Sequence, residues 1–371
     1  MTEKENAMRK FTGFEHGIGM GGWLTNYKRL QVVDPRKRMW ITPGDMEHFA
    51  SYITRDDVAY IASLGADHIR LGFDQIVLEE FENPGVYREE ILRIMSDFFD
   101  WCKEFGLNVM FNMHKAIGAY CDVSAEMNDL CRDPALRKRF TDCWIMLEKR
   151  FSDRDHVAFE LLNELTTPDS EDWNTLADET IRGIRELNPN RIIVIGSAQW
   201  NSPDKLKDLR IWDDENVIYT FHFYAPHEFT HQRGLLQGNQ HVYNREMPYP
   251  CDMERYKEYR RYFGIGTGDL DGWDTMGREW IRHRLQPAAD WVKEHPDKIL
   301  YNGEYGTIRH AKPAWREAYV RDVTDFCRDH EIPYCLWNYL STPYDGNRFS
   351  LVDDDYRKIL SPVFADIIAG R

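Results

Sequence analysis

Short apolar runs and longer amphipathic segments alternate along the whole chain. Each short run has the β-branched and aromatic content of a buried strand, and the segment that follows has helical periodicity. Eight strands are predicted, at residues 14–19, 67–71, 108–113, 157–162, 191–195, 217–221, 299–302 and 334–337. Eight repeats of a strand followed by a helix predict a closed (β/α)8 TIM barrel rather than an open doubly wound sheet.

The helical segments carry their own start and stop signals. Thr54, with Asp57 three residues later, predicts a capping box at a helix start. Gly65 and Gly106 stand where a left-handed residue ends a helix. The local signals therefore agree with the alternating pattern.

One interval, between the sixth strand and the next helix, is far longer than an ordinary βα loop. Aromatic residues stand among many charged ones in it, including Tyr243, Tyr249, Tyr256, Tyr259, Tyr262, Phe263 and Trp273. This composition predicts a lid or subdomain at approximately residues 226–280, over the C-terminal face of a single 1–371 domain. The alternative is a surface elaboration without substrate contact.

Composition removes several classes of protein from consideration. The chain of 371 residues is 42% hydrophobic, which is ample for a packed core. Its formal charge of -15 repels nucleic-acid phosphates and anionic membranes, so neither is expected as a partner. No run is long and apolar enough for a membrane span, and no obligatory protein partner is indicated.

Cysteine usage and the N-terminus bear on the compartment. The seven cysteines are an odd number and form no C-x-x-C pair, which favours free, mostly buried thiols. The charged N-terminal segment MTEKENAMRK is not followed by an apolar run of the kind a secretory signal needs. A cytoplasmic protein is expected, or a secreted one if a signal has been removed from this sequence.

Polar residues with catalytic chemistry follow the predicted strands at their C-terminal ends, where barrel enzymes build their sites. Singly, each has a structural explanation, such as a core histidine, a packing tryptophan or an ion-paired arginine. Together, eight such groups at one end of six strands predict an active site. They are Arg70, His114, Asn163, Glu164, His222, Tyr224, Glu304 and Trp337.

Glu164 and Glu304 supply the two carboxyl groups that glycosidic chemistry requires. One protonates the departing oxygen, and the other attacks the sugar or activates water. Because two close carboxylates repel each other, we expect Glu164 to be the protonated acid/base. Arg70 and the Tyr224 hydroxyl are expected to keep Glu304 ionised as the nucleophile, and Asn163 to bind a sugar 2-hydroxyl.

Aromatic residues near the same end can stack against sugar rings. Trp337 offers a flat apolar face at the end of the eighth strand. Four further tryptophans lie in or near the predicted loops of that face and are candidate platforms: Trp23, Trp40, Trp200 and Trp212.

Seven segments, in this order, resemble the signatures of glycoside hydrolase family 5: G-G-W-L, H-I-R-L, N-M-H, F-E-L-L-N-E-L, F-H-F-Y, N-G-E-Y-G and L-W-N-Y. The resemblance covers nearly the whole barrel, and all eight candidate residues occupy positions that the family uses. F-H-F-Y-A-P-H-E-F-T-H-Q and the long insertion after it are similar to a clostridial endoglucanase branch of the family.

This resemblance implies a retaining mechanism without cofactor or metal, acting on β-1,4-glucan or on mixed or β-1,3-glucan and the derived oligosaccharides. A β-mannanase or an exo-β-glucosidase of the same fold is the alternative. The family's frequent D-M-H-H reads N-M-H-K at Asn112 to Lys115, and N-E-P ends in Leu165. These departures bear on subsite preference rather than on the chemistry.

Three other functions are weighed. The G-x-G-x-x-G at residues 17–22 lacks a convincing following helix, so NAD(P) binding is set aside. His114, Glu164, His222 and Glu304 are possible ligands of a metal-dependent hydrolase or isomerase, although the charge of Arg70 opposes a nearby cation. An inactive glycan-binding barrel is the third, and both intact glutamates argue against it.

Overall fold

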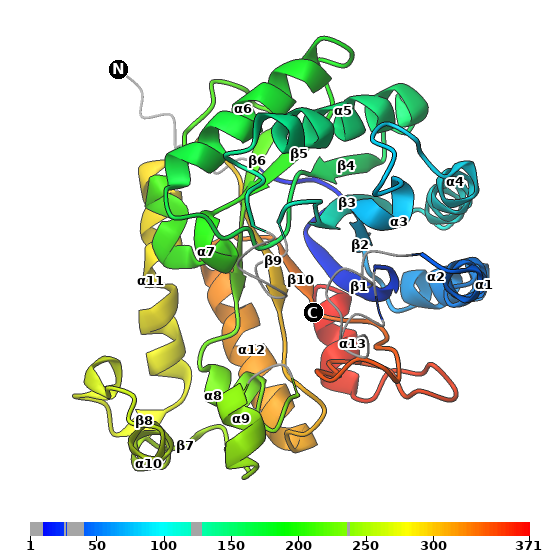
Figure 1. The fold of residues 1–371 in the computed structure, drawn as a ribbon. Coiled ribbons are helices and arrows are strands. Elements are labelled where there is room, and N and C mark those ends of the chain that lie inside the picture. Colours follow the sequence, from blue (N-terminus) through cyan, green and yellow to red (C-terminus); the bar gives the residue numbers. More distant parts are fainter. Residues whose placement is uncertain (1–9, 26, 28–40, 120–127, 236–237) are drawn as a thin grey trace, which may run out of the picture.

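A computed structural model describes residues 10–25, 27, 41–119, 128–235 and 238–371. Eight parallel strands close into a barrel in the order β1-β10-β9-β6-β5-β4-β3-β2 (Figure 1). They are β1 His16–Leu24, β2 His68–Asp74, β3 Asn108–Lys115, β4 Val157–Glu160, β5 Ile193–Gly196, β6 Val217–Phe223, β9 Leu300–Tyr305 and β10 Tyr334–Leu336. The predicted (β/α)8 barrel is confirmed.

Helices surround the barrel and separate its strands from solvent (Figure 1). The longer ones are α1 Pro43–Ser51, α2 Arg55–Ser63, α4 Glu89–Glu104, α5 Pro134–Phe151, α6 Ser170–Arg185, α11 Arg278–Glu294, α12 Pro313–Asp329 and α13 Pro362–Ile368. Thr54 caps α2 in the expected capping box with Asp57. Gly65 and Gly106 have positive φ values of 93° and 73°, the left-handed conformation that a helix-ending residue requires.

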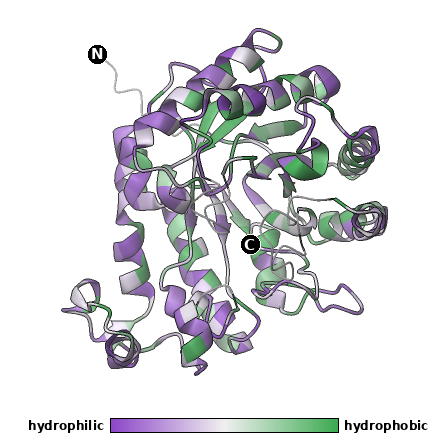
Figure 2. Ribbon diagram, in the orientation of Figure 1, coloured by the Kyte–Doolittle hydropathy of each residue, from purple (hydrophilic) through white to green (hydrophobic). Residues whose placement is uncertain are grey.

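The core has two parts, which together fill the inside and the outside of the sheet. A large apolar cluster lies between the strands and the helices, and a smaller one, which includes Met110, fills the barrel interior. In the smaller cluster the rings of Phe11 and Phe14 stack at 4.5 Å, and Phe11 meets the ring of Tyr301 edge-on at 6.0 Å. Figure 2 shows the apolar residues concentrated in the strands and the polar ones on the outer helix faces. This is the layered filling of a TIM barrel, which holds the strand ends rigidly.

Several strands run further toward their C-terminal ends than the sequence predicted. β9 continues through Glu304 to Tyr305, and β6 continues through His222 to Phe223. The apolar pattern stopped early because His222 and Glu304 are polar, yet both are buried at the mouth of the barrel. β4 differs in the other direction, since it ends at Glu160, four residues before Glu164.

The long interval after β6 is folded. It contains α8 His227–Thr230, α9 Gly238–Tyr243, α10 Glu254–Tyr262 and a short antiparallel pair, β7 Cys251–Asp252 with β8 Thr275–Met276. Tyr249 donates a hydrogen bond to Asp322 of α12 at 2.6 Å, and Figure 1 shows these elements beside α11 and α12. Whether they close over a bound substrate stays a prediction.

Across the described ranges, which begin at residue 10, no helix is long and apolar enough to cross a membrane. Within the same part of the chain, six cysteines are free thiols: Cys102, Cys131, Cys143, Cys251, Cys327 and Cys335. All but Cys251 are buried, as the sequence predicted, and Cys121 lies outside the described residues.

Candidate active site

Arg70 is the centre of a buried polar cluster at the mouth of the barrel. Its side chain is fully buried at the middle of β2. Nε and Nη2 donate to both carboxylate oxygens of Glu160, at 2.6 and 2.7 Å, and Nη1 donates to Glu304 at 2.5 Å. Nη2 also donates to Oδ1 of Asn163 at 2.8 Å. One guanidinium therefore serves two carboxylates from opposite walls of the barrel.

Glu304 receives hydrogen bonds from two side chains and is 5% exposed. Arg70 donates to Oε1, and the Tyr224 hydroxyl donates to Oε2 at 2.8 Å. Burial, with the added charge of Glu304, raises the pKa of Tyr224 well above its ordinary value, so this phenol keeps its proton and remains a donor. The two side chains that the sequence expected beside Glu304 are thus both in contact with its carboxyl group.

Glu164 lies in the loop after β4 with a positive φ of 49° and a side chain that is 24% exposed. Nδ1 of His222 is 2.9 Å from its Oε1. Burial lowers the pKa of His222 to about 4; the nearby Glu304 opposes this shift and Arg70 adds to it. His222 is therefore neutral near pH 7, and it interacts with Glu164 as a hydrogen-bond donor rather than as a cation.

Asn163 and Trp337 line the same opening. Because Oδ1 of Asn163 accepts from Arg70, its Nδ2 group is the end that can donate to a sugar hydroxyl. The Trp337 ring stacks against His114 at 5.6 Å and 5°. A Cβ at Gly19 or Gly21 would come within 2.7 Å of the Trp337 ring, so these two glycines are what allow the indole to lie against β1.

Seven of the eight predicted residues thus lie at or just beyond the C-terminal ends of the strands, whereas Arg70 lies within β2 and reaches Glu304 and Asn163 from there. The four further tryptophans divide. Trp23 is 1% exposed and donates to Phe49, and Trp212 is 8% exposed beside Tyr219, so both are core residues and their expected sugar contact was wrong. Trp200 is 56% exposed at the end of β5. Trp40 lies outside the described residues.

Sequence reasoning missed Glu160, which is fully buried and pairs with Arg70 through both carboxylate oxygens. A signal was present. Glu160 is two residues from Ala158, which packs inside the barrel, and alternate residues of a strand point the same way. The inward direction of Glu160 could therefore have been inferred from the strand assignment alone.

The three departures from the family pattern are all buried, with exposures of 0% for Asn112, 5% for Lys115 and 4% for Leu165. Oδ1 of Asn112 is 3.2 Å from Nδ1 of His114.

Three of the candidate residues have side chains that could bind a metal ion. Glu164, His222 and Glu304 each offer a ligand atom within 4.8 Å of the others, whereas His114 is not part of that group. Nη1 of Arg70 contacts Glu304 at 2.5 Å, and Nη2 lies 3.5 Å from Nε2 of His222. A cation here would face this fixed positive charge, so the donor set suits two carboxyl groups and a neutral imidazole better than a metal.

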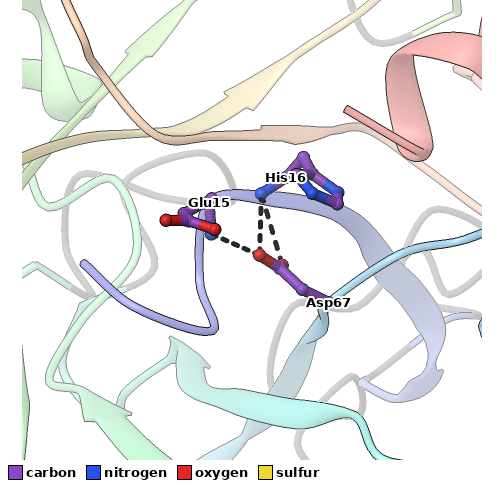
Figure 3. Close-up of side chains that lie close together, drawn as sticks. All are labelled: Glu15, His16 and Asp67. Atoms are coloured by element: carbon purple, nitrogen blue, oxygen red, sulfur yellow. Dashed lines mark hydrogen bonds between the residues drawn. The ribbon is translucent and has the colours of Figure 1, made fainter. Parts of the chain in front are cut away.

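A second group of possible ligands lies at the opposite end of the barrel: Glu15, His16 and Asp67 (Figure 3). The Asp67 carboxylate accepts from the backbone N–H groups of Glu15 at 2.6 Å and His16 at 3.2 Å, and Nδ1 of His68 is 2.6 Å away. Burial alone would raise the pKa of Asp67, but the hydrogen bonds from His68 and the backbone hold it below its ordinary value. Asp67 therefore joins the chain segment before β1 to β2.

A parallel eight-stranded barrel with two carboxyl groups, an arginine and an aromatic platform at its C-terminal mouth defines a (β/α)8 glycoside hydrolase. The family model for cellulase, glycosyl hydrolase family 5, matches residues 36–342. The chain belongs to this family, and the resemblance drawn from its motifs is confirmed. It is an O-glycosyl hydrolase of the endoglucanase type with a polysaccharide substrate.

Relatives and solved structures agree with this assignment. The chain is 34% identical over 364 residues to endoglucanase C of Acetivibrio thermocellus, covering 96% of this chain and 98% of the relative. It is 30% identical over 229 residues to cellodextrinase A of Ruminococcus flavefaciens, covering 61% and 62%. A hyperthermophilic endo-β-1,4-glucanase and the Thermotoga maritima Cel5A complex with cellobiose share the fold. The first has a TM-score of 0.71 at 20% identity and covers 100% of both chains. The second has a TM-score of 0.71 at 21% identity and covers 96% of this chain and 97% of its own.

Proposed function

We propose that this enzyme cleaves internal β-1,4 bonds of glucans by double displacement, with Glu304 as the nucleophile and Glu164 as the acid/base. The observation that carries the proposal is the closeness of two carboxyl groups with unlike partners. Their nearest described oxygens lie within 4.8 Å, which fits a retaining pair and is too close for an inverting pair with a water between them.

In the first step, the Glu304 carboxylate attacks the anomeric carbon while the bond from that carbon to the leaving oxygen breaks. Glu164 gives its proton to this oxygen, which spares the departure of an alkoxide. Arg70 and Tyr224 keep Glu304 ionised before attack, and each has a hydrogen bond to one of its two oxygens. Asn163 is placed to donate to the 2-hydroxyl as charge develops on the ring.

In the second step, the Glu164 carboxylate takes a proton from water, and the oxygen of that water attacks the anomeric carbon. The bond to Glu304 breaks and the carboxylate is regenerated. Two displacements at one carbon leave its configuration unchanged. Trp337 supports the reacting sugar by stacking, since its ring lies parallel to His114 beside the opening.

A substrate panel tests the linkage and the mode of attack together. Carboxymethylcellulose, lichenan, laminarin, glucomannan and short cello-oligosaccharides are digested, and product size and anomeric configuration are measured in the same samples. We expect a rapid fall in the viscosity of carboxymethylcellulose and β-configured new ends. Cleavage of laminarin alone, of mannan linkages in preference, or release of glucose from chain ends only would contradict the proposal.

The role of Glu164 has a separate test. Glu164→Ala is expected to slow cleavage of cello-oligosaccharides by about 10²- to 10⁴-fold, and glycosylation by an activated aryl glycoside far less, because a good leaving group needs no proton. Presteady-state release of the aryl group isolates that step. Equal losses on both substrates would show that Glu164 is structural.

We also propose that the segment at approximately residues 226–280 borders one end of the cleft. Thr230 of α8 donates to the backbone oxygen of Tyr224 at 2.5 Å, and the rings of His231 and Tyr224 meet at 5.3 Å. Glu228 of α8 forms an ion pair with Arg260 of α10, which ties the rest of the segment to this contact. Replacing residues 238–247 by a Gly/Ser linker should change product sizes from polymer. An unchanged product profile would indicate a surface elaboration.

A further inference from the structure

The turn after β5 has an unusual backbone. Three consecutive residues other than glycine, Gln199, Trp200 and Asn201, have positive φ values of 57°, 59° and 53°. Each such residue is strained and persists only when its surroundings fix it. Backbone strain of this kind gathers at functional sites, and this turn stands at the same end of the barrel as Glu164 and Glu304.

Three hydrogen bonds fix the turn. The Trp200 N–H donates to the Leu165 oxygen at 3.3 Å, and Nε2 of Gln199 donates to the Thr167 oxygen at 2.5 Å. Oγ of Ser197 donates to the Ser202 oxygen at 2.7 Å, which closes the turn on itself. The strained turn is therefore attached to the loop that carries Glu164.

The strained conformation turns the Asn201 side chain inward. This side chain is 1% exposed, and Nδ2 lies 3.2 Å from Nε2 of His222. A Cβ at Gly196 would fall within 2.5 Å of three atoms of the Asn201 amide, so only glycine at the end of β5 leaves room for it. Gly196 and the left-handed turn together place the side-chain amide of Asn201 against His222.

Two donors converge on Nε2 of His222, which fixes where its proton lies. Arg70 has no acceptor, and its Nη2 is 3.5 Å from this nitrogen, so Nε2 carries the lone pair. Asn201 must then present its NH2 group. A neutral His222 has its single proton on Nδ1, directed at Glu164 at 2.9 Å.

The charged groups around the imidazole come from three strands and the loop after β4. Arg70 comes from β2, Glu160 from β4 and Glu304 from β9, with Oε2 of Glu304 3.8 Å from Nδ1. Glu164 lies on the Nδ1 side. A proton on Nε2 is thus opposed by Arg70 and by the Asn201 amide, whereas a proton on Nδ1 faces two carboxylates.

We propose that Asn201 is a positioning residue that holds His222 in the Nδ1–H tautomer, so that His222 donates to Glu164 throughout the reaction. Asn201 does not touch the sugar; it acts through His222. The hydrogen bond from Nδ1–H orients the Glu164 carboxyl that exchanges a proton with the leaving group and with water. This proposal rests on Glu164 being the acid/base.

Asn201→Asp tests it directly, because aspartate has nearly the same shape, tolerates a positive φ and presents only acceptors. The ¹⁵N chemical shifts of histidine-labelled enzyme, with His222 assigned by comparison with His222→Gln, report which nitrogen is protonated. We expect Nε2 of His222 to be unprotonated in the wild type and to become protonated in Asn201→Asp. An unchanged Nε2 shift in the variant would overturn the proposal.

Kinetics should follow the tautomer. If Nε2 gains the proton, His222 either turns its Nδ1 lone pair toward Glu164, which then donates to His222, or becomes a cation that keeps Glu164 ionised. Acid catalysis suffers in both cases. We expect about a 10- to 100-fold loss of kcat/KM on cello-oligosaccharides, with a much smaller loss in aryl release from an activated glycoside.

Two further variants separate this effect from strain. Asn201→Gly adopts the positive φ without cost and removes only the amide, so it should show the same leaving-group dependence with a several-fold loss. Gln199→Gly relaxes the same turn but does not contact His222, and it should leave the Nε2 shift unchanged. Equal losses on both substrates in Asn201→Gly, or a moved Nε2 shift in Gln199→Gly, would contradict the proposal. The ¹⁵N result is independent of turnover, so it stands apart from any failure of the assignment of Glu164.

Discussion

The two ends of the barrel both bury carboxylates beside histidine, and they use them differently. Asp67, at the N-terminal end, is 19% exposed, and Glu164, at the mouth, is 24% exposed, so access to water does not separate them. Their partners do. Asp67 accepts from two backbone N–H groups, whereas Glu164 lies 2.9 Å from the side chain of His222 and its neighbour Glu304 accepts from the side chains of Arg70 and Tyr224.

The charge balance differs in the same sense. At the N-terminal end, Asp67 contacts His68, whose other ring nitrogen lies 2.7 Å from the Tyr301 hydroxyl. At the mouth, three carboxyl groups share one guanidinium and a neutral imidazole. Close carboxyl groups of this kind are the arrangement that acid/base chemistry uses. A carboxylate that accepts hydrogen bonds from the backbone, such as Asp67, stabilises the fold. Several carboxyl groups around one arginine are suited to proton transfer.

The largest expected effect comes from removing the nucleophile. Glu304→Ala should lower kcat by about 10⁵-fold or more, because no covalent intermediate can form, while the barrel stays folded. Added azide should partly restore release from an activated aryl glycoside, with an α-configured azide product. Asp67→Asn is the matched change at the other end, and it should lower thermal stability while leaving kcat of the folded enzyme within a few fold. A glycosyl-enzyme trapped by a slow fluorosugar on a residue other than Glu304 would break the comparison.

A smaller effect is expected from Glu160→Gln. Arg70 donates two hydrogen bonds to the Glu160 carboxylate. Removing the negative charge of Glu160 therefore leaves the positive charge of Arg70 less compensated and strengthens its attraction to Glu304. A more strongly stabilised carboxylate is a poorer nucleophile, and kcat should fall by about 10- to 100-fold. The acid limb of the pH profile of kcat/KM should move to lower pH, because the stronger field favours the ionised form.

Glu148→Gln is the matched control for this variant. Glu148 is fully buried and pairs with Arg191 through both oxygens, at 2.7 and 3.1 Å, outside the barrel mouth. Both variants break a buried ion pair and should lose about 3 kcal/mol of stability. Only Glu160→Gln should move the acid limb. An unmoved limb would mean that Glu160 merely holds Arg70 in place.

The barrel and the eight candidate site residues could be predicted from the sequence, because strand ends are marked by a change from apolar to polar residues. The contacts of Glu160 with Arg70 and of Asn201 with His222 could not be predicted, because they depend on the close approach of residues in three dimensions. Glu160 looked like part of a strand, and Asn201 like part of a loop. Trp23 and Trp212 illustrate the reverse error, since a tryptophan near a strand end can turn toward the core as easily as toward the cleft.

The smallest expected effect concerns stability in mild acid. The pKa of His222 is lowered from 6.5 to about 4 by burial, so between these values the unfolded chain binds a proton that the folded enzyme refuses. The free energy of unfolding therefore rises with pH across this window and falls on acidification. Asp67 has a lowered pKa as well, but its contribution is complete above its ordinary value of 3.8 and is lost only below it.

Acidification from pH 7 to pH 4 should thus weaken the mouth before it weakens the N-terminal end. His222→Gln should remove about 3 kcal/mol of the pH dependence of the free energy of unfolding in this window, whereas Asp67→Asn should leave the slope unchanged. Urea unfolding at several pH values measures both slopes. Buried histidines elsewhere, such as His231, contribute to the remaining slope in every variant, because burial also lowers its pKa. Parallel slopes for wild type and His222→Gln would show that His222 is not the group that makes the mouth sensitive to acid.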